Sequence, residues 1–290
     1  RSTKNIVAAA NSIIGNNKDQ IEKEIWTSND EGGKIELHSC STDNEEGSFV
    51  ARKIFDLHQN EHESYPSIAI LYRTNAQSRA IEEALRKMNV PYKIFGGLSF
   101  YKRKEIKDLT AYFRLAVNPN DEEALLRVIN YPKRGIGLTS IQKMQNVAIH
   151  NKRPIWDVMQ HIQTINILPS ATAKKIHEFA TMVKNYHLRI EQEDAYELAM
   201  HIAKTSGVLK DLGDAREDDE GIMRFENVEE LLNGIKEFSE TLSGEENEGL
   251  HTLDTFMEEI ALYTDADEKG KEDAEFVSLM TIHAAKGLEF

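Results

Sequence analysis

The end of the chain joins an apolar run to side chains that could do chemistry. Residues 276–282 (FVSLMTI) predict a buried strand, and the segment that follows supplies His283, Lys286, Gly287 and Glu289. A strand that leads into a histidine, a lysine, a glycine and an acid is typical of α/β proteins, which bind ligands beyond the carboxyl ends of their strands. We expect no metal site, because no second histidine, cysteine or acid lies at a suitable spacing from His283.

A second candidate site follows the apolar run at 67–72 (SIAILY). Arg73, Thr74 and Asn75 close this predicted strand and open a helix that Thr74 or Asn75 would cap. The first backbone N–H groups of a helix are suited to bind phosphate, and the arginine beside them could add a positive charge to such a contact. The same pattern also fits an ordinary capped helix with a surface arginine.

The third candidate site is the turn at 131–139 (YPKRGIGLT) between two predicted helices at 121–130 and 138–150. Its two glycines would let backbone N–H groups approach a phosphate closely, and its basic and hydroxyl side chains would add donors. Such contacts would hold duplex DNA without reading its sequence; a tight turn with solvated basic residues is the alternative. The residues expected to contact duplex DNA are Lys133, Arg134, Gly135, Gly137 and Thr139.

Two aromatic residues, Phe100 and Tyr101, follow the glycine pair at 96–97 and precede a basic run. They could stack on bases. They could equally fill the join between two parts of the protein, and we favour this structural role.

These candidate sites are positioned by alternating strands and helices. Because strands separated by helices favour a parallel sheet, the predicted fold class is α/β. Helices are expected at 3–15, 47–60 and 74–88, and strands at 34–40, 67–72, 92–95 and from 276.

A long helical region interrupts this α/β pattern. From residue 103 to about residue 263 almost every segment has helical spacing of its apolar residues, with breaks at prolines and glycines. The charged stretch 264–275 is expected to be a linker, and 240–249 (ETLSGEENEG) a mobile loop. The sequence therefore predicts a partial parallel-sheet domain with a large all-helical insertion.

Charge is distributed unevenly along the chain. The net charge of −14 over 290 residues argues against nucleic-acid binding if taken alone, because phosphate contacts need lysine and arginine. Residues 102–155, however, carry 11 basic and 5 acidic side chains, a net charge of +6, and support a DNA contact at the turn they contain. Residues 206–275 carry 6 basic and 23 acidic side chains, a net charge of −17. We expect this acidic block to be a solvated surface or to bind a protein partner.

Composition narrows the class of protein further. The hydrophobic content of 40% supports a core, and no apolar run reaches the roughly 18–20 residues of a membrane span, so we expect no membrane partner. The single cysteine, Cys40, excludes an internal disulfide. The opening residues from Arg1 lack the pattern of a signal peptide, and we expect a cytoplasmic location.

Five motifs occur here in the order known from one family. They are RSTKNI, AILYRTNAQSRAIEEAL, GGLSFYKRKEIKDL, NYPKRGIG and TIHAAKGLEF. With them the chain resembles the superfamily 1 DNA helicases of the PcrA/UvrD/Rep family, and the PcrA type most closely. The resemblance implies a RecA-like subdomain, 2A, at 1–101, a helical insertion, 2B, at 102–272, and a truncated return to 2A at 273–290.

The resemblance also implies roles for individual residues. Arg1 would be the catalytic arginine finger that reaches the γ-phosphate of ATP, and Gly287 and Glu289 would also contact the nucleotide, Glu289 at the ribose. The full-length enzyme would use ATP and Mg²⁺ and move 3′ to 5′ at a junction of single-stranded and duplex DNA. The residues expected to contact single-stranded DNA are Arg73, Asn75, His283 and Lys286.

Other parts of such an enzyme are missing from the sequence. It has no G-x-x-x-x-G-K-[ST] phosphate loop and no paired acids after a hydrophobic strand, both of which phosphoryl transfer needs. We therefore expect a fragment that needs the other helicase subdomains, binds no cofactor tightly, and neither hydrolyses ATP nor unwinds DNA alone. Its open sheet edge predicts dimerisation. The alternative is a non-catalytic module of the same ancestry that binds DNA or a protein.

Overall fold

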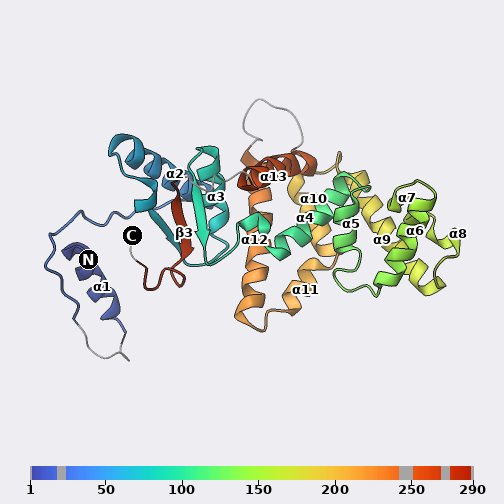
Figure 1. The fold of residues 1–290 in the computed structure, drawn as a ribbon, viewed down its shortest axis with the longest axis horizontal. Coiled ribbons are helices and arrows are strands. Elements are labelled where there is room, and N and C mark those ends of the chain that lie inside the picture. The colour runs from blue at the N-terminus through green and yellow to red at the C-terminus, as the bar shows by residue number, and fades with distance from the viewer. Residues whose placement is uncertain (1, 18–23, 242–250, 269–274, 289–290) are drawn as a thin grey trace. The chain divides into compact units, whose positions relative to one another are not determined.

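The computed structural model describes residues 2–17, 24–241, 251–268 and 275–288 (Figure 1). It divides into two compact units, residues 1–42 and residues 43–290. We describe each unit by itself.

The first unit pairs one helix, α1 (Lys4–Ile14), with an extended segment. The backbone N–H groups of Lys4 and Asn5 donate to the carbonyl oxygens of Asp30 and Glu31 at 3.0 and 3.1 Å. These hydrogen bonds satisfy donors that a helix leaves open in its first turn.

The strand predicted at 34–40 is wrong, because these residues have no regular secondary structure. Their alternating apolar residues, Ile35 and Leu37, are 64% and 96% exposed. A strand is stable only when a neighbouring strand satisfies its backbone groups, and alternation by itself supplies no neighbour. Trp26 of the same unit is likewise 81% exposed.

The second unit contains a three-stranded parallel sheet in the order β1–β3–β2. A short 3₁₀ helix, η1 (Tyr65–Ser67), precedes the first strand. Figure 1 shows the last strand in sequence, in red, between the two earlier ones, so the sheet forms only when distant parts of the unit meet. The α/β fold class is confirmed. The strands are β1 (Ala69–Tyr72), β2 (Tyr92–Phe95) and β3 (Val277–Thr281).

Two helices, α2 (Asp43–Asn60) and α3 (Ser78–Lys87), share one apolar cluster with the sheet. Ile54 of α2 and Leu85 of α3 pack in this cluster with Leu279 of the central strand. The helix was predicted to begin at residue 74, but α3 begins four residues later, at Ser78. A loop therefore joins the end of β1 to α3.

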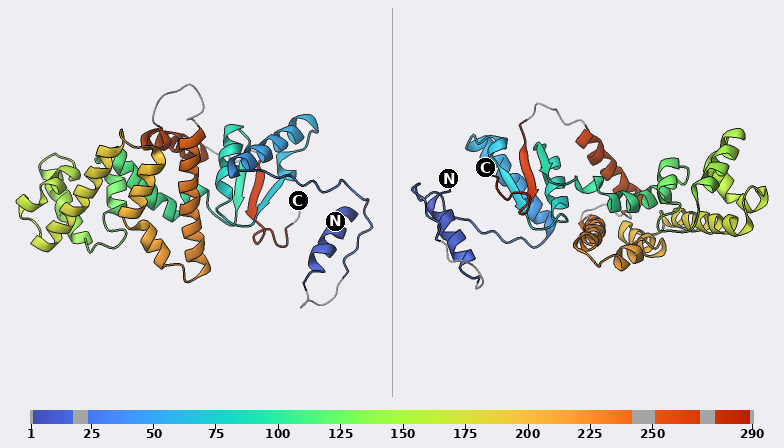
Figure 2. Two further views of the ribbon diagram at one scale, coloured as in Figure 1. Left: turned by 180° about the vertical axis from the view of Figure 1, so that it is seen from behind. Right: turned by 60° about the horizontal axis from the view of Figure 1, so that its bottom comes forward.

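Helices fill the sequence between β2 and β3 in the described residues (Figure 2). A 3₁₀ helix, η2 (Phe100–Lys102), leads into them. The helices are α4 (Lys104–Val117), α5 (Glu122–Val128), α6 (Leu138–His150), α7 (Ile155–Gln160), α8 (Ile162–Ile165), α9 (Ser170–Arg189), α10 (Ala195–Thr205), α11 (Val208–Asp214), α12 (Asp219–Thr241) and α13 (Leu253–Glu268).

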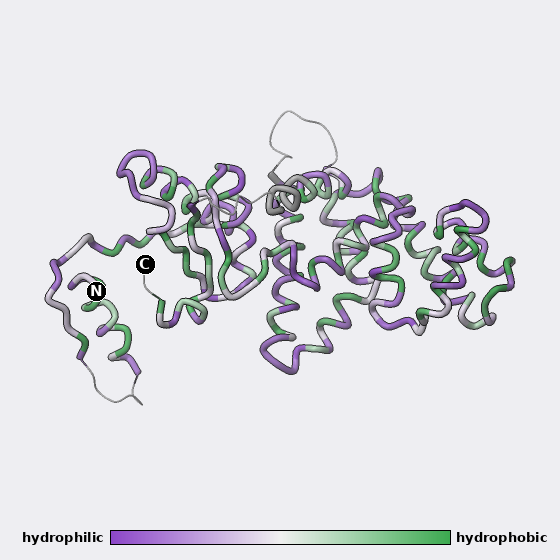
Figure 3. Tube along the Cα trace, in the orientation of Figure 1, coloured by the Kyte–Doolittle hydropathy of each residue, from purple (hydrophilic) through white to green (hydrophobic). Residues whose placement is uncertain are grey.

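These helices have an apolar cluster of their own, separate from that of the sheet. Short hydrophobic and hydrophilic stretches alternate along their trace, as amphipathic helices require (Figure 3). Asp121 and Asp194 cap α5 and α10 by accepting from backbone N–H groups at 3.0 and 2.9 Å. Two clusters in one chain fit the predicted interruption of a sheet domain by a helical insertion.

The linker predicted at 264–275 is wrong in its first part, because α13 continues to Glu268. The mobile loop predicted at 240–249 also begins too early, because α12 continues to Thr241. The remainder of the loop, and residues 269–274 of the linker, lie outside the described residues. Within the described part of the chain, no helix is long and apolar enough to cross a bilayer.

Candidate functional site

The parallel sheet brings three loops to one edge. Because β1, β3 and β2 run in the same direction, the segments 73–77, 282–288 and 96–97 all follow carboxyl ends of strands. Gly96 has φ +72°, and a Cβ built on it would lie 3.0 Å from the Cβ of Ala284. A larger residue at 96 would therefore strain the backbone and crowd the neighbouring loop.

Two residues expected to contact single-stranded DNA meet at this edge. Nη1 of Arg73 lies 3.5 Å from Nε2 of His283, although the two residues are 210 positions apart in sequence. Both side chains are exposed. A guanidinium and an imidazole presented together to solvent form a surface that suits phosphate.

The side chain of Gln77 organises the loop after β1. Its Oε1 accepts from the backbone N–H groups of Arg73 and Thr74 at 2.9 and 3.1 Å. Neither Thr74 nor Asn75 caps α3 as expected; Nδ2 of Asn75 instead lies 2.9 Å from Sδ of Met223 in α12. Because these N–H groups are occupied, any phosphate contact here depends on side chains.

The loop after β3 is a series of turns that presents His283 and Lys286 to solvent. The backbone N–H of Ala284 donates to Oγ1 of Thr281 at 3.1 Å, which fixes the first turn. Gly287 has φ +88° and no heavy atom within 4 Å of an added Cβ, so its backbone is open to a close approach.

Two of the residues expected at an ATP site, Arg1 and Glu289, lie outside the described residues. The chain's ten histidines form no metal site in the described part, where no group of three or more His, Cys, Asp or Glu side chains could hold a metal ion.

The turn predicted to hold duplex DNA is built around Asn130. Its Oδ1 accepts from the backbone N–H groups of Arg134 and Ile136 at 3.0 and 3.1 Å. Gly135 has φ +72°, and a Cβ there would lie 2.9 Å from Nζ of Lys175 in α9. Sequence reasoning missed both Asn130 and Lys175; the asparagine directly before a turn was the available signal.

Arg134 has a structural role that the sequence did not reveal. Its guanidinium donates to the carbonyl oxygens of Val128, Tyr131 and Pro132 at 2.8–3.2 Å and to that of Ser206 at 2.8 Å. It also lies 5.7 and 5.1 Å from the ring centroids of Tyr112 and Phe179. These contacts direct its charge into the fold, whereas the expectation was a charge directed at DNA.

The remaining predicted residues of this turn face solvent. Lys133, Gly135, Gly137 and Thr139 are exposed, and Leu138 beside them is 77% exposed. Gly137 occupies the N-cap position of α6, and no side chain caps this helix.

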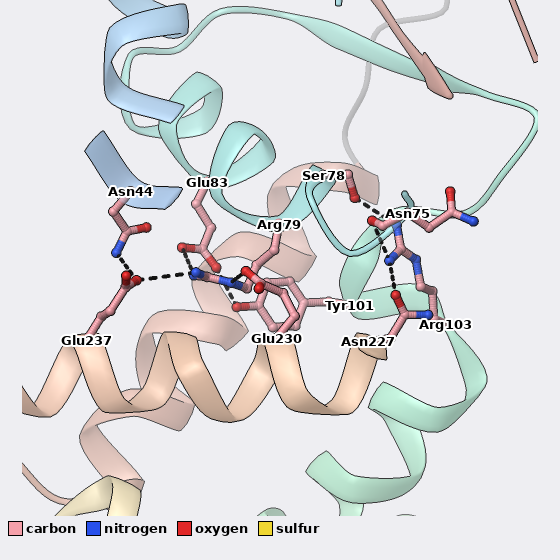
Figure 4. Close-up of polar contacts among 10 residues, drawn as sticks. All are labelled: Asn44, Asn75, Ser78, Arg79, Glu83, Tyr101, Arg103, Asn227, Glu230 and Glu237. Atoms are coloured by element: carbon pink, nitrogen blue, oxygen red, sulfur yellow. Dashed lines mark hydrogen bonds and ion pairs between the residues drawn. The ribbon is translucent and has the colours of Figure 1, made fainter. Parts of the chain in front are cut away.

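A buried ionic cluster joins α3 to α12 (Figure 4). Arg79, whose side chain is 3% exposed, pairs with Glu83 at 3.1 Å, Glu230 at 2.6 Å and Glu237 at 3.4 Å. A Cβ on Gly234 of α12 would lie 2.7 Å from the guanidinium, so this glycine makes room for it. Sequence reasoning missed this cluster; Glu230 and Glu237, which lie two helical turns apart in α12, were the available signal.

Phe100 and Tyr101 are 0% and 5% exposed, as their favoured structural role requires. The hydroxyl of Tyr101 donates to Oε1 of Glu83 at 2.7 Å, and burial raises the pKa of this tyrosine well above its usual range. Oε1 of Glu82 accepts from the backbone N–H of Phe100 at 3.1 Å, and burial raises the pKa of that carboxyl. Both aromatic residues are thus held inside the fold.

Comparisons with known proteins show the family of the chain. The model of the UvrD-like helicase C-terminal domain family matches residues 1–290. The chain is 40% identical over 293 residues to the ATP-dependent DNA helicase PcrA of Leuconostoc citreum. It is 39% and 38% identical over 290 residues to the PcrA helicases of Staphylococcus epidermidis and Staphylococcus aureus. All of this chain is covered in each case, and it spans 38% of the length of each relative.

Proposed function

Because the chain belongs to the UvrD-like helicase C-terminal domain family, we propose that it is part of an ATP-dependent DNA helicase of the PcrA type. Residues 1–101 and 273–290 form subdomain 2A, and residues 102–272 form the helical insertion 2B. The complete enzyme moves 3′ to 5′ along one strand while 2B holds the duplex ahead of it, and it works in the cytoplasm.

The observation that carries the proposal is the meeting of Arg73 and His283 at the sheet edge, 3.5 Å apart. Asn75 belongs to the same loop as Arg73, and Lys286 to the same loop as His283. Cationic and amide side chains on adjacent loops suit the phosphates of a single strand, which the protein binds without reading its sequence.

ATP and Mg²⁺ belong to the complete enzyme in this proposal. Among the described residues, the open backbone at Gly287 fits a bound nucleotide, because a ligand can approach it without meeting a side chain. Arg1 and Glu289 are the other proposed contacts. When bound, ATP supplies the free energy of movement; the residues of this chain hold DNA.

Replacing Arg73 with alanine is expected to weaken binding of a single-stranded oligonucleotide about tenfold, because one charge-assisted phosphate contact is lost. The slope of log K against log salt should fall by about 0.7. Fluorescence anisotropy with a labelled oligonucleotide across a salt series measures both quantities.

The matched control is Arg52→Ala, which removes an exposed arginine from α2 and should leave affinity unchanged. Equal affinities of Arg73→Ala and Arg52→Ala would refute the proposed contact at this edge. A His283→Ala variant tests the second loop in the same way.

Lys133→Ala is expected to weaken binding to a blunt duplex and to reduce its salt slope by about 0.9, because this exposed lysine would neutralise one phosphate. Binding to the single-stranded oligonucleotide should not change. The measurement is a titration of labelled duplex across the same salt series.

Lys236→Ala is the control for duplex binding, since Lys236 is an exposed lysine of α12 on the same insertion. If both lysine variants lose the same affinity, duplex binding reflects net charge alone, and the turn at 131–139 has no special role.

A further inference from the structure

The motif at 96–109 (GGLSFYKRKEIKDL) contains a buried cation that none of the proposed DNA contacts uses. Arg103 is 7% exposed. Its Nη1 donates to the backbone oxygen of Asn75 at 2.8 Å, and its Nη2 to Oγ of Ser78 at 2.7 Å. Its Nε donates to the carbonyl oxygen of Leu98 at 3.4 Å. Arg103 thus holds both the loop after β1 and the loop after β2.

The same guanidinium also reaches the helical insertion. Nη1 of Arg103 donates to Oδ1 of Asn227 in α12 at 2.8 Å, and Nδ2 of Asn227 donates to Oε1 of Glu105 at 2.6 Å. Asn227 is 1% exposed and Glu105 is 6% exposed. Because both polar atoms of this buried amide are bonded, its orientation fixes Arg103 and Glu105 together.

Figure 4 shows that Arg103 lies between the Asn75–Ser78 segment and α12. A second contact runs in parallel, since Nδ2 of Asn75 lies 2.9 Å from Sδ of Met223, also in α12. Contacts with α12 therefore hold the loop that carries Arg73 and Asn75, while the Arg73 side chain is exposed to solvent.

We propose that Arg103, Glu105 and Asn227 are a positioning unit that fixes the loop at 73–77 in the conformation that binds a single strand. The inference rests on the proposed function, because it assumes that this loop contacts single-stranded DNA. In this proposal, the affinity of the sheet edge for single-stranded DNA depends on α12, a helix of the insertion that does not itself contact the DNA.

The test compares Asn227→Ala with Asn44→Ala in the full chain. Both substitutions remove an asparagine that bonds at the α12 junction, but Asn44 bonds Glu237 at 2.5 Å and not the loop. Single-strand affinity is measured by anisotropy, with thermal unfolding and duplex affinity measured beside it. Asn227→Ala should weaken single-strand binding about tenfold, and Asn44→Ala should not.

A merely structural role is excluded by combining Asn227→Ala with Arg73→Ala. If α12 acts through the position that the loop gives to Arg73, the Asn227 substitution should have less than a twofold effect once the Arg73 side chain is gone, so the two losses are not additive. Duplex affinity through the turn at 131–139 should be unchanged in every variant.

If Asn227→Ala does not fold, Arg103→Lys tests the same proposal. Lysine keeps the positive charge but lacks the planar guanidinium that bonds the loop and α12 at the same time. Folded Asn227→Ala or Arg103→Lys with wild-type affinity would overturn the positioning unit and leave the proposed function intact. Absence of single-strand binding by the wild type at low salt would overturn both.

Discussion

Arg79→Ala is expected to lower the free energy of unfolding by about 3–5 kcal/mol, the usual effect of removing one partner of a buried ion pair. The substitution leaves Glu83, Glu230 and Glu237 without the cation that they share. Their side chains are only 13%, 11% and 25% exposed, so water replaces the lost contact poorly.

The direction of the pKa changes supports this expectation. Burial would lower the pKa of Arg79, but the carboxylates of Glu83 and Glu230 raise it overall. Burial raises the pKa of Glu230, and Arg79 opposes that rise. The cluster therefore holds charges that burial disfavours, and its stability depends on keeping the opposite charges together.

Denaturant unfolding followed by circular dichroism measures the loss. Arg52→Ala, at an exposed position of α2, should change the free energy of unfolding by less than about 0.5 kcal/mol. Adding Glu230→Gln to Arg79→Ala should recover part of the stability, because it removes one uncompensated buried charge. A loss below about 1 kcal/mol for Arg79→Ala would show that the cluster is solvated.

Gly47→Ala is expected to destabilise the protein by at least about 1–3 kcal/mol, the range for overpacking of a buried site. A Cβ on Gly47 of α2 would lie 2.4 Å from the carbonyl oxygen of Ala80 and 3.2 Å from the backbone nitrogen of Ile81 in α3. Because the obstacle is backbone, it cannot rotate away, and the two helices must separate.

Helix propensity alone favours the opposite result, since alanine is about 1 kcal/mol better than glycine inside a helix. Gly213→Ala in α11 is the control, because an added Cβ there lies no closer than 3.9 Å to the side chain of Arg216. It should be neutral or stabilising by denaturant unfolding. If Gly47→Ala behaves like Gly213→Ala, α2 and α3 do not pack as closely as described.

The local pattern of apolar residues was sufficient to predict most helices and strands of the second unit. The strand at 92–95 and the helix at 138–150 lie where their spacing placed them, because each carries its own start and stop signals. The strand predicted at 34–40 failed for the opposite reason. Alternating residues predict an extended segment, but a strand forms only when another strand pairs with it.

The basic block at 102–155 shows how far charge alone can mislead. Its net charge of +6 includes Arg103 and Arg134, whose guanidinium groups bond inside the fold. Arg114 and Arg127 pair with Asp121 and Asp108 at 2.8 Å. The charge that this block presents to solvent is therefore carried largely by its lysines, a distinction that residue counts cannot make.

The net charge of the acidic block at 206–275 likewise does not show which of its charges are paired inside the fold. Glu230 and Glu237 belong to it, yet they lie at the junction with α3 and neutralise Arg79. A role of the remaining acidic residues in binding a protein partner stays a prediction.

The sequence established the family, the fold class and the candidate residues, because motifs and periodicity are properties of short stretches of chain. Only the tertiary structure decided which of those residues meet. Arg73 and His283 are 210 positions apart and come within 3.5 Å because β3 inserts beside β1. Arg79, Arg103 and Arg134 are turned inward by partners from other helices, and burial depends on contacts between distant segments that no local pattern records.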